Sequence, residues 1–334
     1  MRLYQTTATW ITVLWTCSAA AAVGDDSILA RDAAVKVETS VAFTEGPAWH
    51  PELGVLFSDG ANDRIMRLDR AGELHVFRHP SGPANGLVFD RQGRLIACEQ
   101  GNRRVTRTEA DGTITVLADQ YEGRKFNTPN DVAVDARDRI YFTDPRYGDR
   151  GNMEMFDAMG RGIEGVYRID PDGTVARIIT HEVDRPNGIA VSADDRFLYV
   201  ADNVNNVVGG ARKLWRFPLN DDGSVDRAGG NVVFDWGTGR GPDGMALDQA
   251  GRLFVAAGLN VANPPYETAG RYKAGIYVLA PEGRHLTTVP VPLDEVTNCT
   301  FGGDDLRTLY LTAGHRLMSF RVNTPGNVAW PSAK

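Results

Sequence analysis

Cysteine is scarce in this chain of 334 residues, and its placement excludes several kinds of site. The three cysteines are Cys17, Cys98 and Cys299, so the closely spaced pairs typical of zinc-thiolate sites are absent. Cysteine often packs as a small apolar residue in protein cores. We therefore expect Cys98 and Cys299 to be core residues rather than partners in a disulfide.

Clustered positive charge and the motifs of several enzyme classes are also missing. The chain has 36 basic and 43 acidic residues, a formal charge of −7, and no basic cluster beyond pairs such as Arg103–Arg104. Phosphate binding needs clustered Lys and Arg, so we expect no nucleic acid partner. There is no Gly-x-Ser-x-Gly sequence, which argues against an α/β-type serine hydrolase, and no EF-hand loop.

Helical periodicity is nearly absent, and a sequence motif, called a phrase below, recurs six times along the chain. Each copy reads as a polar turn, a short apolar strand, a second turn and a second strand, and most copies are followed by further strands. Four-stranded units that repeat every 40 to 57 residues are typical of a β-propeller. We predict an all-β fold, a six-bladed β-propeller with four-stranded blades around a central channel. The phrases are FTEGPAWHPELGVLFSD from Phe43, GPANGLVFDRQGRLIACE from Gly82, NTPNDVAVDARDRIYFTD from Asn127, RPNGIAVSADDRFLYVAD from Arg185, GPDGMALDQAGRLFVAAG from Gly241 and VTNCTFGGDDLRTLYLTAG from Val296.

The N-terminal segment has a different character. Residues 1–22 contain one early arginine, an uncharged stretch and a run of alanines, the pattern of a secretory signal peptide. We expect it to be removed, which gives a secreted or periplasmic protein without stable membrane association; a retained anchor is the alternative. Residues 23–334 are expected to form a single catalytic propeller domain, as a monomer or small homo-oligomer. The strand in AVKVETSVAF, residues 34–43, should complete the last blade and remove the free edges.

One polar residue lies at the start of the first strand in every unit. Because the first strand of a blade lines the channel, these six residues should form a ring at one mouth. Turn chemistry accounts for recurring Asn and Asp, but not for a glutamate or for a ring made only of oxygen-bearing side chains. The six are Glu45, Asn85, Asn130, Asn187, Asp243 and Asn298.

Such a ring is suited to a hard divalent cation, which prefers carboxylate and amide oxygens. Glu45 and Asp243 would balance its charge, and two or so asparagines would complete the coordination. We expect Asn85 and Asn298 to be structural or to contact bound substrate. One divalent metal ion is therefore predicted as cofactor, with calcium as the expected ion and magnesium, manganese or zinc as alternatives.

Two insertions are expected on the same face as the ring. Residues 147–165 and residues 258–275 are long, polar and glycine-rich, and both connect the second and third strands of their units. Because strands alternate in direction, this connection lies on the side of the turn that precedes the first strand. Loops of this length in a compact domain commonly serve as lids or binding loops.

The phrases, taken in order, resemble the gluconolactonase / regucalcin (senescence marker protein) family from about Phe43 to Arg321. The matching phrases are FTEGPAWHPELGVLFSD, FNTPNDVAVD followed by IYFTDPRYG, RPNGIAVSADDRFLYVAD, GPDGMALDQAGRLFVA and TNCTFGGDDLRTLYLTAG. The resemblance implies a six-bladed propeller that hydrolyses sugar-acid lactones with one catalytic divalent metal ion. It also implies a metal-binding set consisting of Glu45, Asn130, Asn187 and Asp243.

Hydrolysis of a lactone needs a nucleophile, stabilisation of the oxyanion and a proton for the leaving alkoxide. A metal ion can polarise the carbonyl group and activate the attacking water, and Asp243 is the candidate general base. A cation lowers the pKa of a carboxylate that it touches, so activation of the water without Asp243 is the alternative. The expected substrate-binding residues are Asn127, Asn130, Asp144, Tyr147 and Asn298. For Asp144 the alternative is a purely structural role as a turn residue at the end of a strand.

Two other functions are compatible with the same residues. One is a phosphotriesterase-like hydrolase that uses the same metal site, as in the related diisopropylfluorophosphatases. The other is a non-catalytic, ligand-binding propeller with a structural calcium ion. The sequence leaves open which sugar lactone would be the substrate of the predicted carboxylic-ester hydrolase.

Overall fold

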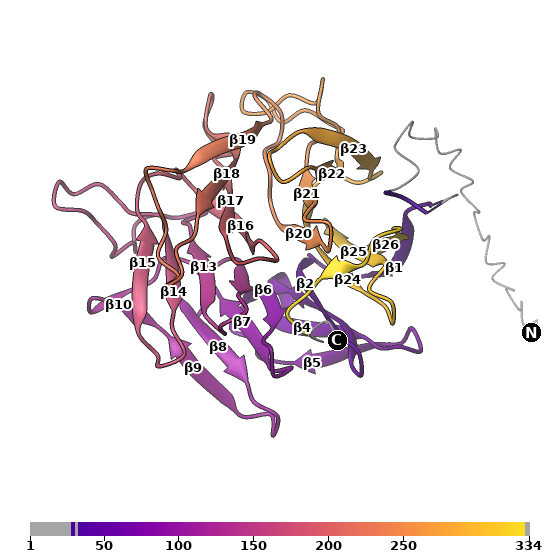
Figure 1. Cartoon of the computed structure of the whole chain (residues 1–334), viewed down its shortest axis with the longest axis horizontal. Helices are drawn as coiled ribbons and strands as arrows, with labels where there is room; N and C mark the ends of the chain where they lie inside the picture. Colours follow the sequence, from indigo (N-terminus) through magenta and orange to yellow (C-terminus); the bar gives the residue numbers. More distant parts are fainter. Residues whose placement is uncertain (1–27, 31–32, 331–334) are drawn as a thin grey trace, which may run out of the picture.

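The chain folds into six antiparallel sheets arranged as a ring (Figure 1). This computed structural model describes residues 28–30 and 33–330. The predicted signal peptide, residues 1–22, lies outside the described residues, so that boundary stays a prediction. Within the described part of the chain, no helix combines the length and apolar character needed to cross a membrane.

Each blade contains four strands, which follow chain order from the channel outward in the first five blades. Blade one contains β2 (Glu45–His50), β3 (Gly54–Asp59), β4 (Arg64–Leu68) and β5 (Leu74–Arg78), with the short helix η1 (Gly60–Asn62) after β3. Blade two contains β6 (Ala84–Phe89), β7 (Leu95–Glu99), β8 (Arg104–Thr108) and β9 (Ile114–Ala118). Blade three contains β12 (Val132–Val134), β13 (Ile140–Asp144), β14 (Gly165–Ile169) and β15 (Val175–Ile179).

The second half of the ring repeats this plan. Blade four contains β16 (Pro186–Val191), β17 (Phe197–Asn203), β18 (Arg212–Pro218) and β19 (Asn231–Asp235). Blade five contains β20 (Met245–Asp248), β21 (Leu253–Ala257), β22 (Gly275–Leu279) and β23 (His285–Pro290). Blade six contains β24 (Val296–Gly302), β25 (Thr308–Ala313), β26 (Arg316–Arg321) and β1 (Lys36–Ser40). A two-stranded hairpin, β10 (Gln120–Tyr121) with β11 (Arg124–Lys125), lies between blades two and three.

The six-bladed propeller predicted from the repeat is therefore confirmed, including its closure. β1 pairs antiparallel with β26, so a strand from the start of the chain completes the last blade. Figure 1 shows this last blade beside the first one. An additional strand that the repeat did not predict, β27 (Gly326–Asn327), pairs with the inner strand β20.

The apolar core lies between neighbouring blades, because each blade presents an apolar face to the next. Strands β3, β7 and β13 have only buried residues, whereas the outermost strands such as β9 alternate between exposed and partly buried residues. Cys98 in β7 and Cys299 in β24 are both buried free thiols. The prediction that they are core residues is confirmed.

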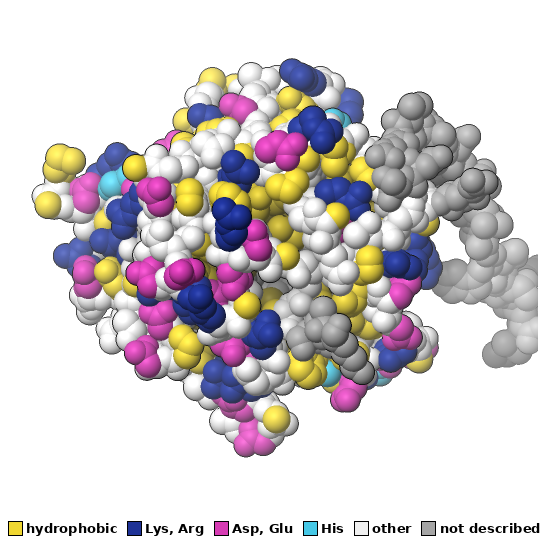
Figure 2. Space-filling model, viewed as in Figure 1, with side chains coloured by type: hydrophobic (Ala, Val, Ile, Leu, Met, Phe, Trp, Pro, Cys, Tyr) yellow, Lys and Arg dark blue, Asp and Glu magenta, His cyan; other side chains and the backbone are white. Residues whose placement is uncertain are grey.

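Charge is mixed across the visible surface. Figure 2 shows acidic and basic side chains interspersed on one face of the molecule, without a continuous basic patch.

Candidate functional site

The six ring positions lie at the same end of the inner strands. Glu45 is the first residue of β2. The second or third position of an inner strand is occupied by Asn85, Asn187 and Asn298. Two residues before β12 and β20, respectively, lie Asn130 and Asp243. The pairing register shifts beside several of these positions, between Glu45 and Ala48 and between Pro186 and Ile189, for example. Such irregularities redirect side chains away from the regular pleat, here at the channel mouth.

The glycines that follow four of these residues allow neighbouring inner strands to approach closely. A Cβ atom on Gly188 would lie 2.1 Å from the carbonyl oxygen of Asp243, and one on Gly46 would lie 2.1 Å from that of Asn85. Gly86 donates its backbone N–H to the carbonyl oxygen of Asn130, at 2.7 Å. Gly86 and Gly188 do not have positive φ, so close packing of strands, rather than a left-handed turn, requires glycine there.

Carboxylates converge at the centre of this ring. Burial and the neighbouring carboxylate of Asp243 raise the pKa of Glu45 well above its usual value. Burial raises the pKa of Asp243 to about 7, although the Arg240 guanidinium acts to lower it and the Asp131 carboxylate raises it. Burial likewise raises the pKa of Asp131 to about 6. Three buried acidic groups at the ring therefore influence one another electrostatically.

Amide side chains complete the group. Asn187 and Asn298 each provide a hydrogen bond that lowers the pKa of a neighbouring acid, Asp243 and Glu45 respectively. The Asn298 Oδ1 atom also accepts the backbone N–H of Cys299 at 2.8 Å. Asn130 is 5% exposed. The structure thus brings the predicted ring residues Glu45, Asn187, Asp243 and Asn298 together from four blades.

This donor set is chemically suited to a divalent cation. Oδ1 of Asp243 is buried and makes no hydrogen bond to any described residue. The pKa values of Glu45 and Asp243 are raised mainly because both carboxylates are buried, and a bound cation would offset the cost of ionising them. Within the described residues, no group of three or more His, Cys, Asp or Glu side chains is arranged to hold a metal ion. The candidate set instead combines two carboxylates with the amide oxygens of Asn130 and Asn187, the ligand type that calcium and magnesium prefer.

Two of the predicted substrate-binding residues are enclosed in the protein. Asn127 and Asp144 have no exposed surface. Oδ2 of Asp144 accepts the backbone N–H of Asn127 at 2.8 Å, and Nδ2 of Asn127 donates to the carbonyl oxygens of Asp144 and Ile163. This arrangement corresponds to the alternative role for Asp144 at a strand end, since the residue ends β13. Contact of either residue with substrate stays a prediction.

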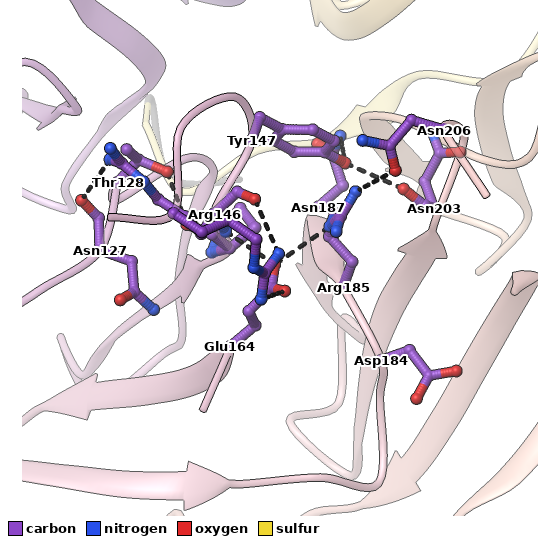
Figure 3. Close-up of polar contacts among 12 residues, drawn as sticks. Asn127, Thr128, Arg146, Tyr147, Glu164, Asp184, Arg185, Asn187, Asn203 and Asn206 are labelled. Carbon is purple, nitrogen blue, oxygen red and sulfur yellow. Dashed lines mark hydrogen bonds and ion pairs between the residues drawn. The ribbon is translucent and has the colours of Figure 1, made fainter. Parts of the chain in front are cut away.

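Tyr147, by contrast, reaches the ring. Its hydroxyl oxygen accepts a hydrogen bond from Nδ2 of Asn187 at 2.9 Å and donates to the carbonyl oxygen of Asn203 at 3.2 Å. Figure 3 shows Tyr147 directed at these two residues, with Arg185 and Glu164 beside them. Because Tyr147 belongs to the insertion 147–165 and Asn187 to the ring, these contacts place that loop on the face of the ring, as expected.

Two features of the site were not predicted from the sequence: Asp131 and a cluster of ion pairs. Asp131 occupies the position that is glycine after four of the other ring residues, and this substitution in the repeat was the available signal. In the cluster, Glu267 is fully buried and binds the Arg240 guanidinium with both oxygens, at 2.7 and 2.9 Å. Arg240 lies three residues before Asp243, so this ion pair joins the insertion 258–275 to the site. No local pattern linked these distant charges.

Comparisons with known proteins agree with this architecture. The chain is 29% identical over 323 residues to a gluconolactonase from Zymomonas mobilis, covering 90% of this chain and 85% of that protein. It is also 29% identical to a pentonolactonase from Haloferax volcanii, covering 83% of each. A solved gluconolactonase from Xanthomonas campestris superposes with a TM-score of 0.73 at 28% identity, covering 89% of this chain and 91% of the other. The predicted enzyme class, a carboxylic-ester hydrolase acting on lactones, is the class of these named relatives.

A family model also matches most of the chain. The model described as the SMP-30/gluconolactonase/LRE-like region matches residues 43–315, which include all six ring positions. The family expected from the repeated phrases is thereby confirmed. This chain belongs to the SMP-30/gluconolactonase/LRE-like family.

Proposed function

We propose that the protein hydrolyses sugar-acid lactones at the channel mouth and that the reaction depends on a divalent cation. The observation that carries this proposal is the convergence of Glu45 and Asp243 with amide side chains, in which Oδ1 of Asp243 has no partner among the described residues. The named relatives act on gluconolactone and pentonolactone. Lactone hydrolysis is therefore the reaction class that the site and the family both favour.

The residues that would hold the cation are Glu45, Asn130, Asn187 and Asp243. A divalent cation held there would polarise the lactone carbonyl and facilitate deprotonation of water. Calcium is the ion we propose, because the donors are all oxygen atoms.

In this proposal Asp243 also moves the proton. Its carboxylate accepts a proton from the attacking water, through the oxygen atom that does not bind the cation, as the water oxygen bonds to the carbonyl carbon. The ring C–O bond then breaks, and the same proton passes to the leaving alkoxide oxygen, giving the open-chain hydroxy acid. Arg240, whose charge lowers the pKa of Asp243, helps to keep this carboxylate ionised before the reaction.

The decisive experiment is a lactone panel assayed after chelation. The purified protein is treated with a chelator, and hydrolysis of several aldonolactones is followed by acid release while calcium, magnesium, manganese and zinc are added back singly. We expect activity to fall on chelation and to return with at least one ion. Full activity without metal, or no recovery with any ion, would contradict the proposed cation dependence.

A matched pair of variants tests the role of Asp243. Asp243→Asn removes the proton acceptor and one charge, and we expect a loss of about 10²–10⁴-fold in kcat. Asp221→Asn, which alters a fully exposed carboxylate, should keep full activity. A phosphotriester in the same panel tests the alternative hydrolase, and turnover of that compound without any lactone would replace the proposal. Cation binding without turnover of any substrate would favour the non-catalytic module.

Secretion to the periplasm or beyond belongs to the same proposal. It is supported only by the pattern of residues 1–22. Mass spectrometry of the mature protein from fractionated cells would identify the N-terminal residue, and an intact N-terminus would favour a retained anchor.

A further inference from the structure

Tyr147 occupies an unusual position between two blades. It follows β13 of blade three, yet its hydroxyl group contacts two residues of blade four, Asn187 in β16 and Asn203 at the end of β17 (Figure 3). Tyr147 is partly buried. A phenol has an ordinary pKa of about 10, so it keeps its proton at neutral pH and can donate it in a hydrogen bond.

The two hydrogen bonds of this hydroxyl define the orientation of Asn187. A phenol has one proton, and the carbonyl oxygen of Asn203 can only accept, so the proton of Tyr147 is directed there at 3.2 Å. The hydroxyl oxygen must then accept from its other neighbour, 2.9 Å away, which has to be the Nδ2 donor of Asn187. In this arrangement Nδ2 of Asn187 is directed at Tyr147, and Oδ1 of Asn187 is available as an acceptor.

The tyrosine ring is itself fixed in place. The Arg185 guanidinium lies over the ring, 5.2 Å from its centroid. Arg185 is held in turn by Oε2 of Glu164 at 3.1 Å and by Oδ1 of Asn206 at 2.9 Å. Glu164 and Arg185 are both buried. The buried Arg185–Glu164 pair thus limits the movement of the Tyr147 ring, and Tyr147 in turn limits rotation of the Asn187 amide.

We propose that Tyr147 is a positioning residue for the divalent cation, because its hydroxyl holds the Asn187 amide with Oδ1 free to bind the ion. This inference rests on the proposed function, in which Asn187 is a ligand. It differs from the substrate contact that the sequence suggested for Tyr147. Hydrogen bonds to metal ligands commonly contribute 10–100-fold to metal affinity.

The test is calorimetric titration of calcium into chelator-treated full-length protein. Tyr147→Phe removes the hydroxyl group and keeps the ring under Arg185. We expect the calcium Kd to rise by about 10-fold or more, because the Asn187 amide loses the partner that orients it. At saturating calcium, kcat should return toward that of the wild type, and KM for the lactone should stay unchanged.

Tyr199→Phe is the matched control. Tyr199 is 1% exposed, and its hydroxyl donates to the carbonyl oxygen of Pro281 at 3.1 Å. The control therefore also loses one hydroxyl that bonds to the backbone, but at a different place, and its calcium Kd should match the wild type. An equal loss of affinity in both variants would contradict a specific role for Tyr147.

The outcomes separate this inference from the proposed function. If the wild type binds calcium and Tyr147→Phe binds it equally well, the positioning role is wrong while the proposed function stands. If affinity is unchanged and KM rises, Tyr147 contacts substrate instead. If the wild type binds no divalent cation, the proposed cation dependence fails, and the inference fails with it.

Discussion

At the scale of single residues, the Asn-Gly and Asp-Gly dipeptides of the repeat each serve two purposes in this protein. Asn187-Gly188 and Asp243-Gly244 are typical turn sequences, and they do precede or begin strands. Yet a Cβ atom at Gly244 would lie 2.0 Å from the Asn298 side chain. The glycine allows the next blade to approach, and the preceding polar residue is then directed into the ring.

Asp144 allows a pH prediction at the residue scale. Burial raises its pKa to about 8, whereas an aspartate in an unfolded chain has a pKa of about 3.9. Between these values the folded state holds a proton that the unfolded state releases, so the free energy of unfolding falls as pH rises. Asp144→Asn should remove this contribution while an amide oxygen can still accept the N–H of Asn127.

Thermal unfolding of chelated protein from pH 5 to pH 8 measures the effect. From pH 5 to pH 8, the Tm of the wild type should fall relative to that of Asp144→Asn by at least about 2 °C. This is the shift expected for ~1 kcal/mol in a large domain. Asp221→Asn, at an exposed carboxylate, should follow the wild type throughout. Parallel curves for all three proteins would show that Asp144 is ionised in the folded state.

At the scale of elements, buried ion pairs and hydrogen bonds to its backbone attach the insertion 258–275 to the rest of the protein. Its Glu267 binds Arg240 and lies 3.8 Å from Arg212, and the three side chains are between 0 and 14% exposed. Arg212 also donates to the carbonyl oxygen of Tyr266 in the same loop. The segment that the sequence suggested as a lid or binding loop is therefore anchored beside Asp243 by a buried carboxylate.

Glu267→Gln should loosen this loop and destabilise the protein. Removing one partner of a buried ion pair typically costs about 3–5 kcal/mol, because the remaining charge stays buried without compensation. We expect a lower Tm and faster limited proteolysis within residues 258–275. Glu282→Gln is the control, since its ion pair with Arg284 is exposed, and exposed pairs contribute only about 0–1 kcal/mol. Equal Tm values for the two variants would mean that Glu267 does not anchor the loop.

At the scale of the whole molecule, closure of the ring joins the two ends of the chain. β1 pairs with β26 through four residue pairs, from Lys36 with Ser319 to Ser40 with Arg316. Ile28 adds to this closure, because it is 1% exposed in the core cluster of blades five and six, and its carbonyl oxygen accepts the N–H of Asn323. Ile28 therefore contributes to closure of the ring together with β1.

Truncation tests the closure directly. A chain that begins at Ile28 should keep the Tm of the longer protein, because it retains β1 and the buried isoleucine. A chain that begins at Val41 loses both and exposes the edge of β26, so we expect a strongly lowered Tm and a tendency to aggregate. Calorimetry and light scattering would measure both changes. Identical unfolding of the two truncated chains would show that the last blade is stable with three strands.

The sequence by itself determined the fold, because turn residues and apolar alternation are local and recur six times. It also determined which residues occupy the ring, since each has the same place in its repeat. Only the tertiary structure decided how these residues are supported. The Asp131 carboxylate of another blade raises the pKa of Asp243, and Tyr147 contacts Asn187 across a blade boundary. Contacts between distant segments depend on how neighbouring blades pack, and no local pattern in the chain encodes that packing.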